Sequence, residues 1–133
     1  MTRYVLDVGA ALRLAKENSQ IPAGHELLAP TLFRSQVLSA LHESVTRGDM
    51  KAEVARNRLA YVGRLPMRLL GDAMLRRRAW ELADQLGWAS TYDAEYVALT
   101  QLQADAFVTV DRGLARRLKG VVVVAPIEEL LRP

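Results

Sequence analysis

Three aspartates, Asp7, Asp93 and Asp111, each stand where a short apolar run gives way to a predicted helix. Apolar, β-prone runs that alternate with amphipathic helices imply parallel strands whose sheet is covered by helices on both faces. Right-handed crossovers then bring the carboxyl ends of such strands and the starts of the following helices to one edge. The sequence therefore predicts an α/β fold, a three-layer α/β/α sandwich with a central parallel sheet, whose ligand-binding edge carries Asp7 and Asp111.

Length and composition bound the kind of protein. The 133 residues, half of them hydrophobic, are enough for one core and too few for two ordinary domains, so we predict a single domain over residues 1–133. Cysteine is absent, which excludes disulfides, thiolate metal ligands and thiol nucleophiles, and fits a reducing cytoplasm. The first apolar run reaches Asp7 after only three residues, so we expect neither a signal peptide nor a membrane span.

The charge balance is mildly basic. Eighteen Lys and Arg residues against fifteen Asp and Glu residues give a formal net charge of +3. If several acids surround a metal ion, the remaining surface is more basic than this count, which favours a polyanionic partner. Arginines cluster at 76–78 and around Arg112, Arg116 and Arg117, although a solvated helix face is the more ordinary explanation for any one cluster.

Periodicity and helix caps predict the order of the elements. Strands are expected at 4–6, 106–110 and 121–124, and helices at 10–16, 31–47, 51–62, 73–86, 93–102, 111–118 and 127–131. Asp72 and Asp111 are predicted N-caps, and Gly48, Gly63 and Gly87 are predicted helix stops. His25 is assigned to a loop rich in proline and glycine.

Each aspartate also has a structural explanation. Asp111 and Asp93 are suited to capping or stabilising a helix start, and Asp7 to closing an Asx turn. Carboxylates gathered at one edge, however, raise each other's pKa unless a cation or hydrogen-bond donors lie between them. Mg²⁺ or Mn²⁺ suits such oxygen ligands, and can polarise a phosphodiester and activate water. His25 and His42 lack metal-ligand spacing and are assigned to the surface or to a satisfied core position.

Four segments, in order along the chain, carry a family resemblance. They are Tyr4-Val5-Leu6-Asp7, then residues 29–41 with Gln36 at their centre, then Thr91-Tyr92-Asp93-Ala94-Glu95-Tyr96-Val97-Ala98-Leu99, then Val108-Thr109-Val110-Asp111-Arg112-Gly113-Leu114. Together they resemble a PIN domain of the VapC toxin type. The resemblance implies an α/β/α fold and a Mg²⁺- or Mn²⁺-dependent endoribonuclease. It also implies a toxin that is neutralised by a small antitoxin protein and that forms a homodimer.

The resemblance also assigns residues to the site. Asp7, Asp93 and Asp111 match the family's metal-binding aspartates, and Thr109 matches a small hydroxyl residue two positions before the last of them. Arg112, beside Asp111, is a further supporting candidate. Two departures stand out. Ser39 occupies a position where asparagine is common, and Gln36 occupies one where the family normally has glutamate.

Gln36 leaves two hypotheses about activity. An amide oxygen can still bind a metal or its waters, but the loss of one negative charge lowers metal affinity. Glu43 lies on the same helix face but ~10 Å further along, and Glu95 points to a different face from Asp93, so neither replaces Gln36. The chain is therefore either an active ribonuclease, in which Gln36 orients a water, or a catalytically weakened PIN module that binds RNA or antitoxin without efficient turnover.

A third interpretation treats Asp7 as the acceptor of a phospho-acceptor α/β domain, such as a receiver or a dehalogenase-like phosphatase. Asp7 is followed by Val8-Gly9, which lacks the acid or threonine expected two residues after a dehalogenase nucleophile. A receiver would need an acidic pair beside its acceptor, and none is evident. This interpretation therefore fits the sequence poorly.

Overall fold

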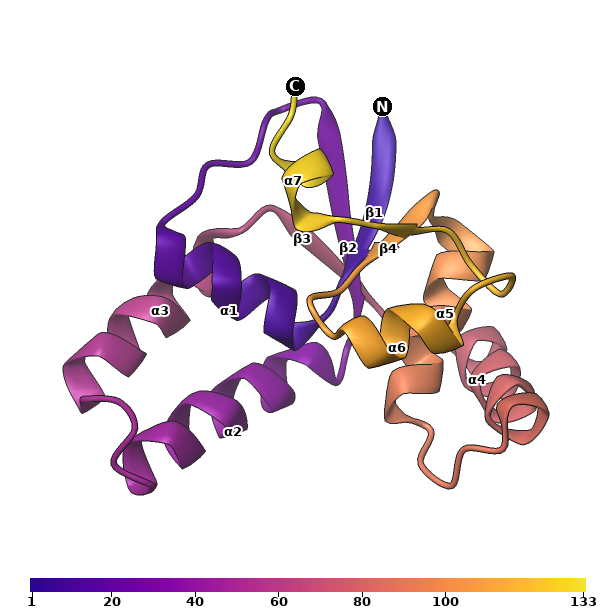
Figure 1. Cartoon of the computed structure of the whole chain (residues 1–133), viewed down its shortest axis with the longest axis horizontal. Helices are drawn as coiled ribbons and strands as arrows, with labels where there is room; N and C mark the ends of the chain where they lie inside the picture. Colours follow the sequence, from indigo (N-terminus) through magenta and orange to yellow (C-terminus); the bar gives the residue numbers. More distant parts are fainter.

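Five parallel strands form the centre of the fold in the computed structural model, which describes Met1–Pro133 (Figure 1). The strands are β1 (Thr2–Leu6), β2 (His25–Pro30), β3 (Met67–Leu70), β4 (Ala106–Val108) and β5 (Val124–Ala125). They are arranged in the order β3-β2-β1-β4-β5, and every neighbouring pair is parallel. The central parallel sheet that the sequence predicts is thus confirmed.

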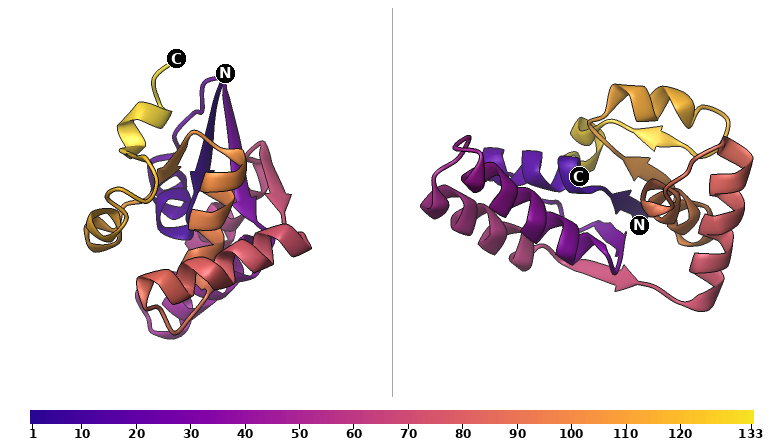
Figure 2. Two further views of the ribbon diagram at one scale, coloured as in Figure 1. Left: turned by 90° about the vertical axis from the view of Figure 1, so that its right-hand side faces the viewer. Right: turned by 90° about the horizontal axis from the view of Figure 1, so that it is seen from below.

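Helices cover both faces of this sheet, so the three-layer α/β/α fold is also confirmed (Figure 2). The helices are α1 (Val8–Glu17), α2 (Phe33–Thr46), α3 (Ala52–Arg64), α4 (Ala73–Leu86), α5 (Tyr92–Gln103), α6 (Arg112–Arg117) and α7 (Ile127–Leu130). Helix α5 packs against β1, β2 and β4 through its fully buried Ala94, Val97 and Ala98. Because this apolar stripe is fixed against the sheet, the first turn of α5 is held at the sheet's edge.

The strand order reverses between β1 and β4. The chain runs from β1 outward through β2 to β3, then crosses back to β4 and β5 on the other side of β1. Parallel sheets bind ligands in the crevice at such a switch point, outside the carboxyl ends of the strands. Asp7 directly follows β1, and its N–H donates to the Val108 carbonyl of β4 at 3.3 Å. Asp7 and Asp111 therefore leave the sheet side by side at its switch point.

Two strands escape the sequence prediction, and one is shifted. His25 begins β2 and packs edge-on against Tyr4 at 5.2 Å between ring centroids, so its assignment to a loop is wrong. Strand β2 begins with polar residues and ends at Pro30, and β3 is a four-residue edge strand, so neither gives a clear periodic signal. The strand expected at 121–124 is also wrong: Val121 donates to the Leu118 carbonyl in a turn, and β5 is Val124–Ala125.

Helix boundaries differ less. Gly63 and Pro66 are together the predicted stop of the helix before them; α3 continues through Gly63 to Arg64, and the conformational restriction that Pro66 places on Leu65 ends it. Within α2, Phe33, Val37 and Leu41 are buried, whereas Leu38 is 57% exposed. The Asp72 N-cap and the left-handed Gly87 at the end of α4 are as predicted. None of the helices combines the length and hydropathy needed to cross a membrane.

Candidate active site

The aspartates at the sheet edge cap helices. The Asp7 Oδ1 accepts from the Ala10 N–H at 2.9 Å, and the Asp111 Oδ1 accepts from the Leu114 N–H at 3.0 Å. Asp72 caps α4 in the same way, with its Oδ1 2.9 Å from the Leu75 nitrogen. Capping is therefore the structural role expected for an aspartate before a helix, and each cap uses one oxygen of the carboxylate.

The electrostatics set the edge aspartates apart. Burial raises the pKa of Asp7, and the nearby charges of Asp93 and Asp111 raise it further, against hydrogen bonds from Thr109 and from the Ala10 N–H that lower it. Burial likewise raises the pKa of Asp93, the Asp111 charge adds to this, and the Arg117 charge opposes it. The three carboxylates are thus close enough to repel one another, as three groups around one site should be.

Thr109 lies between two of these acids. Its side chain hydrogen-bonds to Asp7 and lowers the pKa of that carboxyl, while its Oγ1 accepts from the Asp111 N–H at 3.1 Å. Thr109 is buried, so these contacts fix its hydroxyl group. The structure thus places Thr109 where it couples the loop after β4 to the carboxylate after β1.

Asp7 and Asp93 line one cavity. It has a volume of about 410 Å³, and Gln36, Ser39, Glu43 and Tyr96 also contribute to its wall. Asp111 does not line this cavity, although its charge acts on both acids that do. Asp93 reaches it from the first turn of α5, where Thr91, the N-cap residue, makes no side-chain cap. Asp93 is thus not a strand-end residue but follows the loop between α4 and α5.

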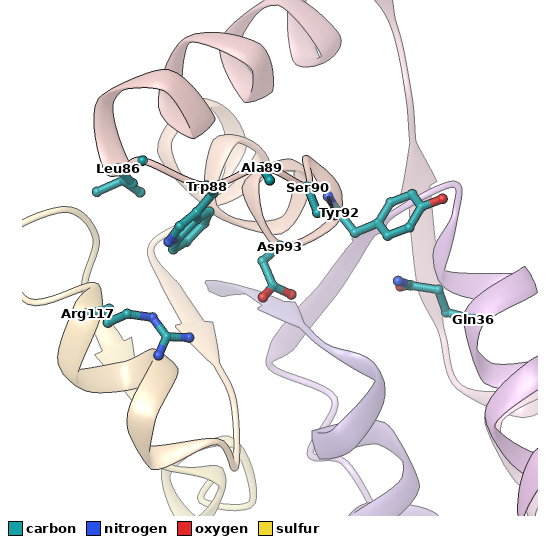
Figure 3. Close-up of a pocket in the computed structure, with 9 residues that line it drawn as sticks. Gln36, Leu86, Trp88, Ala89, Ser90, Tyr92, Asp93 and Arg117 are labelled. Carbon is teal, nitrogen blue, oxygen red and sulfur yellow. Dashed lines mark hydrogen bonds between the residues drawn. The ribbon is translucent and has the colours of Figure 1, made fainter.

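Gln36 is held by Tyr96. The Tyr96 hydroxyl donates to the Gln36 Oε1 at 2.6 Å, which joins α5 to α2 across the cavity. Tyr96 is 3% exposed, and burial, followed by the charges of Asp7 and Asp93, raises the pKa of its hydroxyl, which stays protonated. The Gln36 oxygen thus has one lone pair in use, and its NH₂ group is a donor on the cavity wall that makes no hydrogen bond to another residue. Figure 3 shows the Gln36 amide directed toward Asp93.

Glu43 and Glu95, the two glutamates considered as replacements for Gln36, have separate surroundings. Glu43 lies on the cavity wall and accepts a hydrogen bond from Ser39, one turn before it on α2. Glu95 does not line the cavity; burial raises its pKa, and Arg76 of α4 opposes this. Neither residue takes the position of Gln36.

The residues that carry oxygen ligands fit a water-rich metal site better than a closed cage. No three of the Asp, Glu and His side chains converge closely enough to hold one ion together. Mg²⁺ commonly binds through only one or two carboxylates and retains several waters, which phosphate oxygens can replace. Two repelling, partly desolvated carboxylates on one cavity wall, Asp7 and Asp93, meet that requirement. The donor set thus fits a hard divalent cation.

A second cavity adjoins the first and shares Gln36 and Asp93 with it. It has a volume of about 740 Å³, and its other lining residues include Trp88, Tyr92 and Arg117. Figure 3 shows Asp93 with Trp88 and Arg117 on one side and Tyr92 and Gln36 on the other. Periodicity gave no reason to single out Trp88 or Arg117, because a loop and a short helix bring them here. Arg112, the predicted supporting residue, is exposed and lines neither cavity.

Comparisons with known proteins agree with this architecture. No family model matches the chain. Ribonuclease VapC9 of Mycobacterium tuberculosis is 32% identical over 114 residues, which covers 84% of this chain and 87% of the relative. The crystal structure of PAE2754 from Pyrobaculum aerophilum has a TM-score of 0.73 at 24% identity and covers 98% of this chain and 93% of its own. The structure of VapBC-1 from nontypeable Haemophilus influenzae has a TM-score of 0.62 at 15% identity and covers 95% and 98%, respectively.

Proposed function

Since this chain belongs to the VapC ribonuclease family, we propose that it is a Mg²⁺- or Mn²⁺-dependent endoribonuclease, the toxin component of a toxin–antitoxin module. The observation that carries the proposal is the pair Asp7 and Asp93. The two carboxylates line one cavity beside the switch point of the sheet, and burial and mutual charge raise the pKa of at least Asp7. A divalent cation bound between two such carboxylates relieves their mutual repulsion, which favours binding.

Each residue has a role in this proposal. Asp7 and Asp93 would hold the ion, and Asp111 would add negative charge beside them. Thr109 fixes the orientation of Asp7. The bound metal supplies polarisation of a phosphodiester and an activated water. Gln36 offers its NH₂ group to a phosphate oxygen or to that water, because its own oxygen is bonded to Tyr96.

The test is cleavage of structured RNA by the purified protein with added Mn²⁺ or Mg²⁺. Cleavage is expected with either ion, and EDTA and Asp7→Asn should each abolish it. Asp72→Asn is the matched control, because Asp72 also caps a helix through its carboxylate but lies outside both cavities. If Asp7→Asn cleaves as fast as the wild type, the activity is contamination and the proposal is wrong.

A second candidate function rests on Gln36. Gln36 carries no charge, and one lone pair of its oxygen is used by Tyr96, so it is a weaker ligand for a cation than a glutamate, which favours a weakened module that binds RNA or antitoxin without efficient turnover. The substitution Gln36→Glu separates the two functions. A weakened module should gain metal-dependent cleavage, whereas an active ribonuclease with a working amide should gain little. If the wild type already cleaves RNA and Gln36→Glu cleaves it at the same rate, the second candidate is wrong.

The antitoxin and the second protomer are further parts of the proposal. Phe33, Val37, Leu59 and Val62 line an apolar groove of about 310 Å³ between α2, α3 and β3. We assign this groove to an apolar helix of a small antitoxin protein, because Leu59 is partly exposed there and Phe33 and Val37 form its buried floor. Homodimer formation and a cytoplasmic location stay predictions. Light scattering that gives a monomeric mass at every concentration would contradict the dimer.

A further inference from the structure

The second cavity has the composition of a nucleotide subsite. It lies next to the acidic cavity, and its volume of about 740 Å³ is within the range, roughly 300–1,000 Å³, of sites that enclose small ligands. The Trp88 indole and the Arg117 guanidinium line it on the same side of Asp93, which lies at the junction with the acidic cavity (Figure 3). An aromatic face and a cation beside a phosphodiester-cleaving site match the two chemical parts of a nucleotide.

Trp88 is held in place rather than loosely exposed. Gly87 adopts the left-handed conformation at φ 71° that ends α4, and the Trp88 N–H then donates to the Ala83 carbonyl at 2.8 Å. The side chain is half-buried and packs against the core while its remaining surface lines the cavity. A rigid indole of this kind loses little conformational entropy when a base stacks on it.

Arg117 is available to a phosphate. It is exposed on the last turn of α6 and forms no ion pair, and its charge acts on Asp93 across the cavity. A guanidinium is a bidentate donor that matches phosphate oxygens. A phosphate bound by Arg117 would lie on the Trp88 side of Asp93. That phosphate would belong to the nucleotide next to the one that is cleaved.

We propose that this cavity binds one unpaired RNA nucleotide next to the scissile phosphate, with its base stacked on Trp88 and its phosphate bound by Arg117. The inference rests on the proposed function, whose site it shares. A base within a duplex has both faces covered, so stacking on Trp88 selects single-stranded segments such as loops. The cavity thus sets where in a structured RNA the protein binds.

The experiment measures RNA binding without turnover. The Asp7→Asn protein is titrated with a fluorescently labelled single-stranded RNA octamer and with the same sequence in a duplex, in Mg²⁺. The single strand should bind at least tenfold more tightly. Trp88→Leu, which keeps an apolar side chain but removes the aromatic face, should weaken single-strand binding by roughly 5- to 100-fold, the effect of one lost base stack. Trp88→Phe should retain most of the binding.

The chain contains matched controls for both residues. Trp80 is 67% exposed on α4 and lines neither cavity, so Trp80→Leu should bind like the parent. Arg117→Gln should weaken binding and reduce its salt dependence, whereas Arg116→Gln, one position away and outside the cavity, should do so less. In a Trp80→Phe background, where Trp88 is the single tryptophan, single-stranded RNA should quench the fluorescence.

The outcomes separate this inference from the proposed function. Equal binding by the Trp88→Leu and Trp80→Leu proteins, or equal affinity for single strand and duplex, would overturn the subsite. If the wild type still cleaves RNA with metal in that case, the ribonuclease function stands without it. If Trp88 controls binding but neither the wild type nor Gln36→Glu ever cleaves RNA, the subsite stands and the ribonuclease function fails.

Discussion

The Tyr96 hydroxyl donates to the Gln36 Oε1 at 2.6 Å, so the amide of Gln36 on α2 is held by a buried tyrosine on α5. A glutamate at this position would present a second oxygen, with charge, to the cavity. Glutamine held in this way presents a donor instead. The Gln36 NH₂ group is thus a donor that an oxygen acceptor in the cavity could use.

Removing the tyrosine hydroxyl tests whether this orientation matters. Tyr96→Phe should lower the free energy of unfolding by about 1 kcal/mol, the contribution of one hydrogen bond, as measured by urea denaturation in EDTA. In a protein that cleaves RNA it should also lower kcat more than it raises KM, because the Gln36 amide becomes free to turn. In the Gln36→Ala background, Tyr96→Phe should have no effect on kcat. Additive effects in this cycle would show that the hydroxyl acts independently of Gln36.

The substitution Gln36→Glu should destabilise the folded protein without metal and stabilise it with metal. Gln36→Glu places a further carboxylate beside Asp7 and Asp93, so in EDTA its Tm should fall below that of the wild type. With Mn²⁺ the added ligand charge should tighten metal binding by roughly tenfold and raise the Tm above that of the wild type. Calorimetric Mn²⁺ titration and thermal melts provide the two measurements. Gln36→Met, which is uncharged and of similar size, should show no such crossing.

The raised pKa of Asp7 predicts a pH-dependent stability. Because burial raises the folded-state pKa above the unfolded value, the contribution of this carboxyl is most favourable at low pH and is lost as pH rises through the folded pKa. Asp7→Asn keeps the N-cap but cannot ionise, so in EDTA it should melt at a higher temperature than the wild type near neutral pH. The gain should vanish as the pH falls below about 4, where aspartic acids in the unfolded chain are protonated.

The control is Asp72→Asn, which changes an N-cap away from the acid cluster. A constant difference in Tm between Asp7→Asn and the wild type at every pH would contradict the claim that ionisation of the buried Asp7 carboxyl destabilises the folded protein.

Two glycines provide a paired test of backbone packing. A Cβ added at Gly71, just after β3, would lie 2.7 Å from the Thr31 Oγ1 and 3.1 Å from its Cγ2. Every staggered rotamer of Thr31 leaves at least one of its two heavy atoms in one of these close positions, so Gly71→Ala should destabilise the protein by about 1–3 kcal/mol. Gly63 lies inside α3 with nothing near its added Cβ, so Gly63→Ala should stabilise by about 0.5–1 kcal/mol. Denaturant midpoints measure both, and equal effects at the two positions would refute this account.

The sequence alone determined the class of fold and two of its helix N-caps, Asp72 and Asp111. Asp7 and Asp111 lie before helices and after apolar strands, and these local signals survive in the structure, where both residues cap helices at the switch point. Strand β2 was missed because its polar start and terminal Pro30 carry little periodic signal. Its place beside β1 is decided by pairing with residues far away in the sequence.

Only the tertiary structure decided the chemistry around the aspartates. Asp93 joins Asp7 because α5 is packed across three strands, and Tyr96 meets Gln36 although they are 60 positions apart in the sequence. Trp88 and Arg117 come from a loop and a short helix that no local pattern relates. Helix caps and apolar periodicity act over a few residues and can be read along the chain. Burial, charge repulsion and the direction of an amide depend on what the fold brings together.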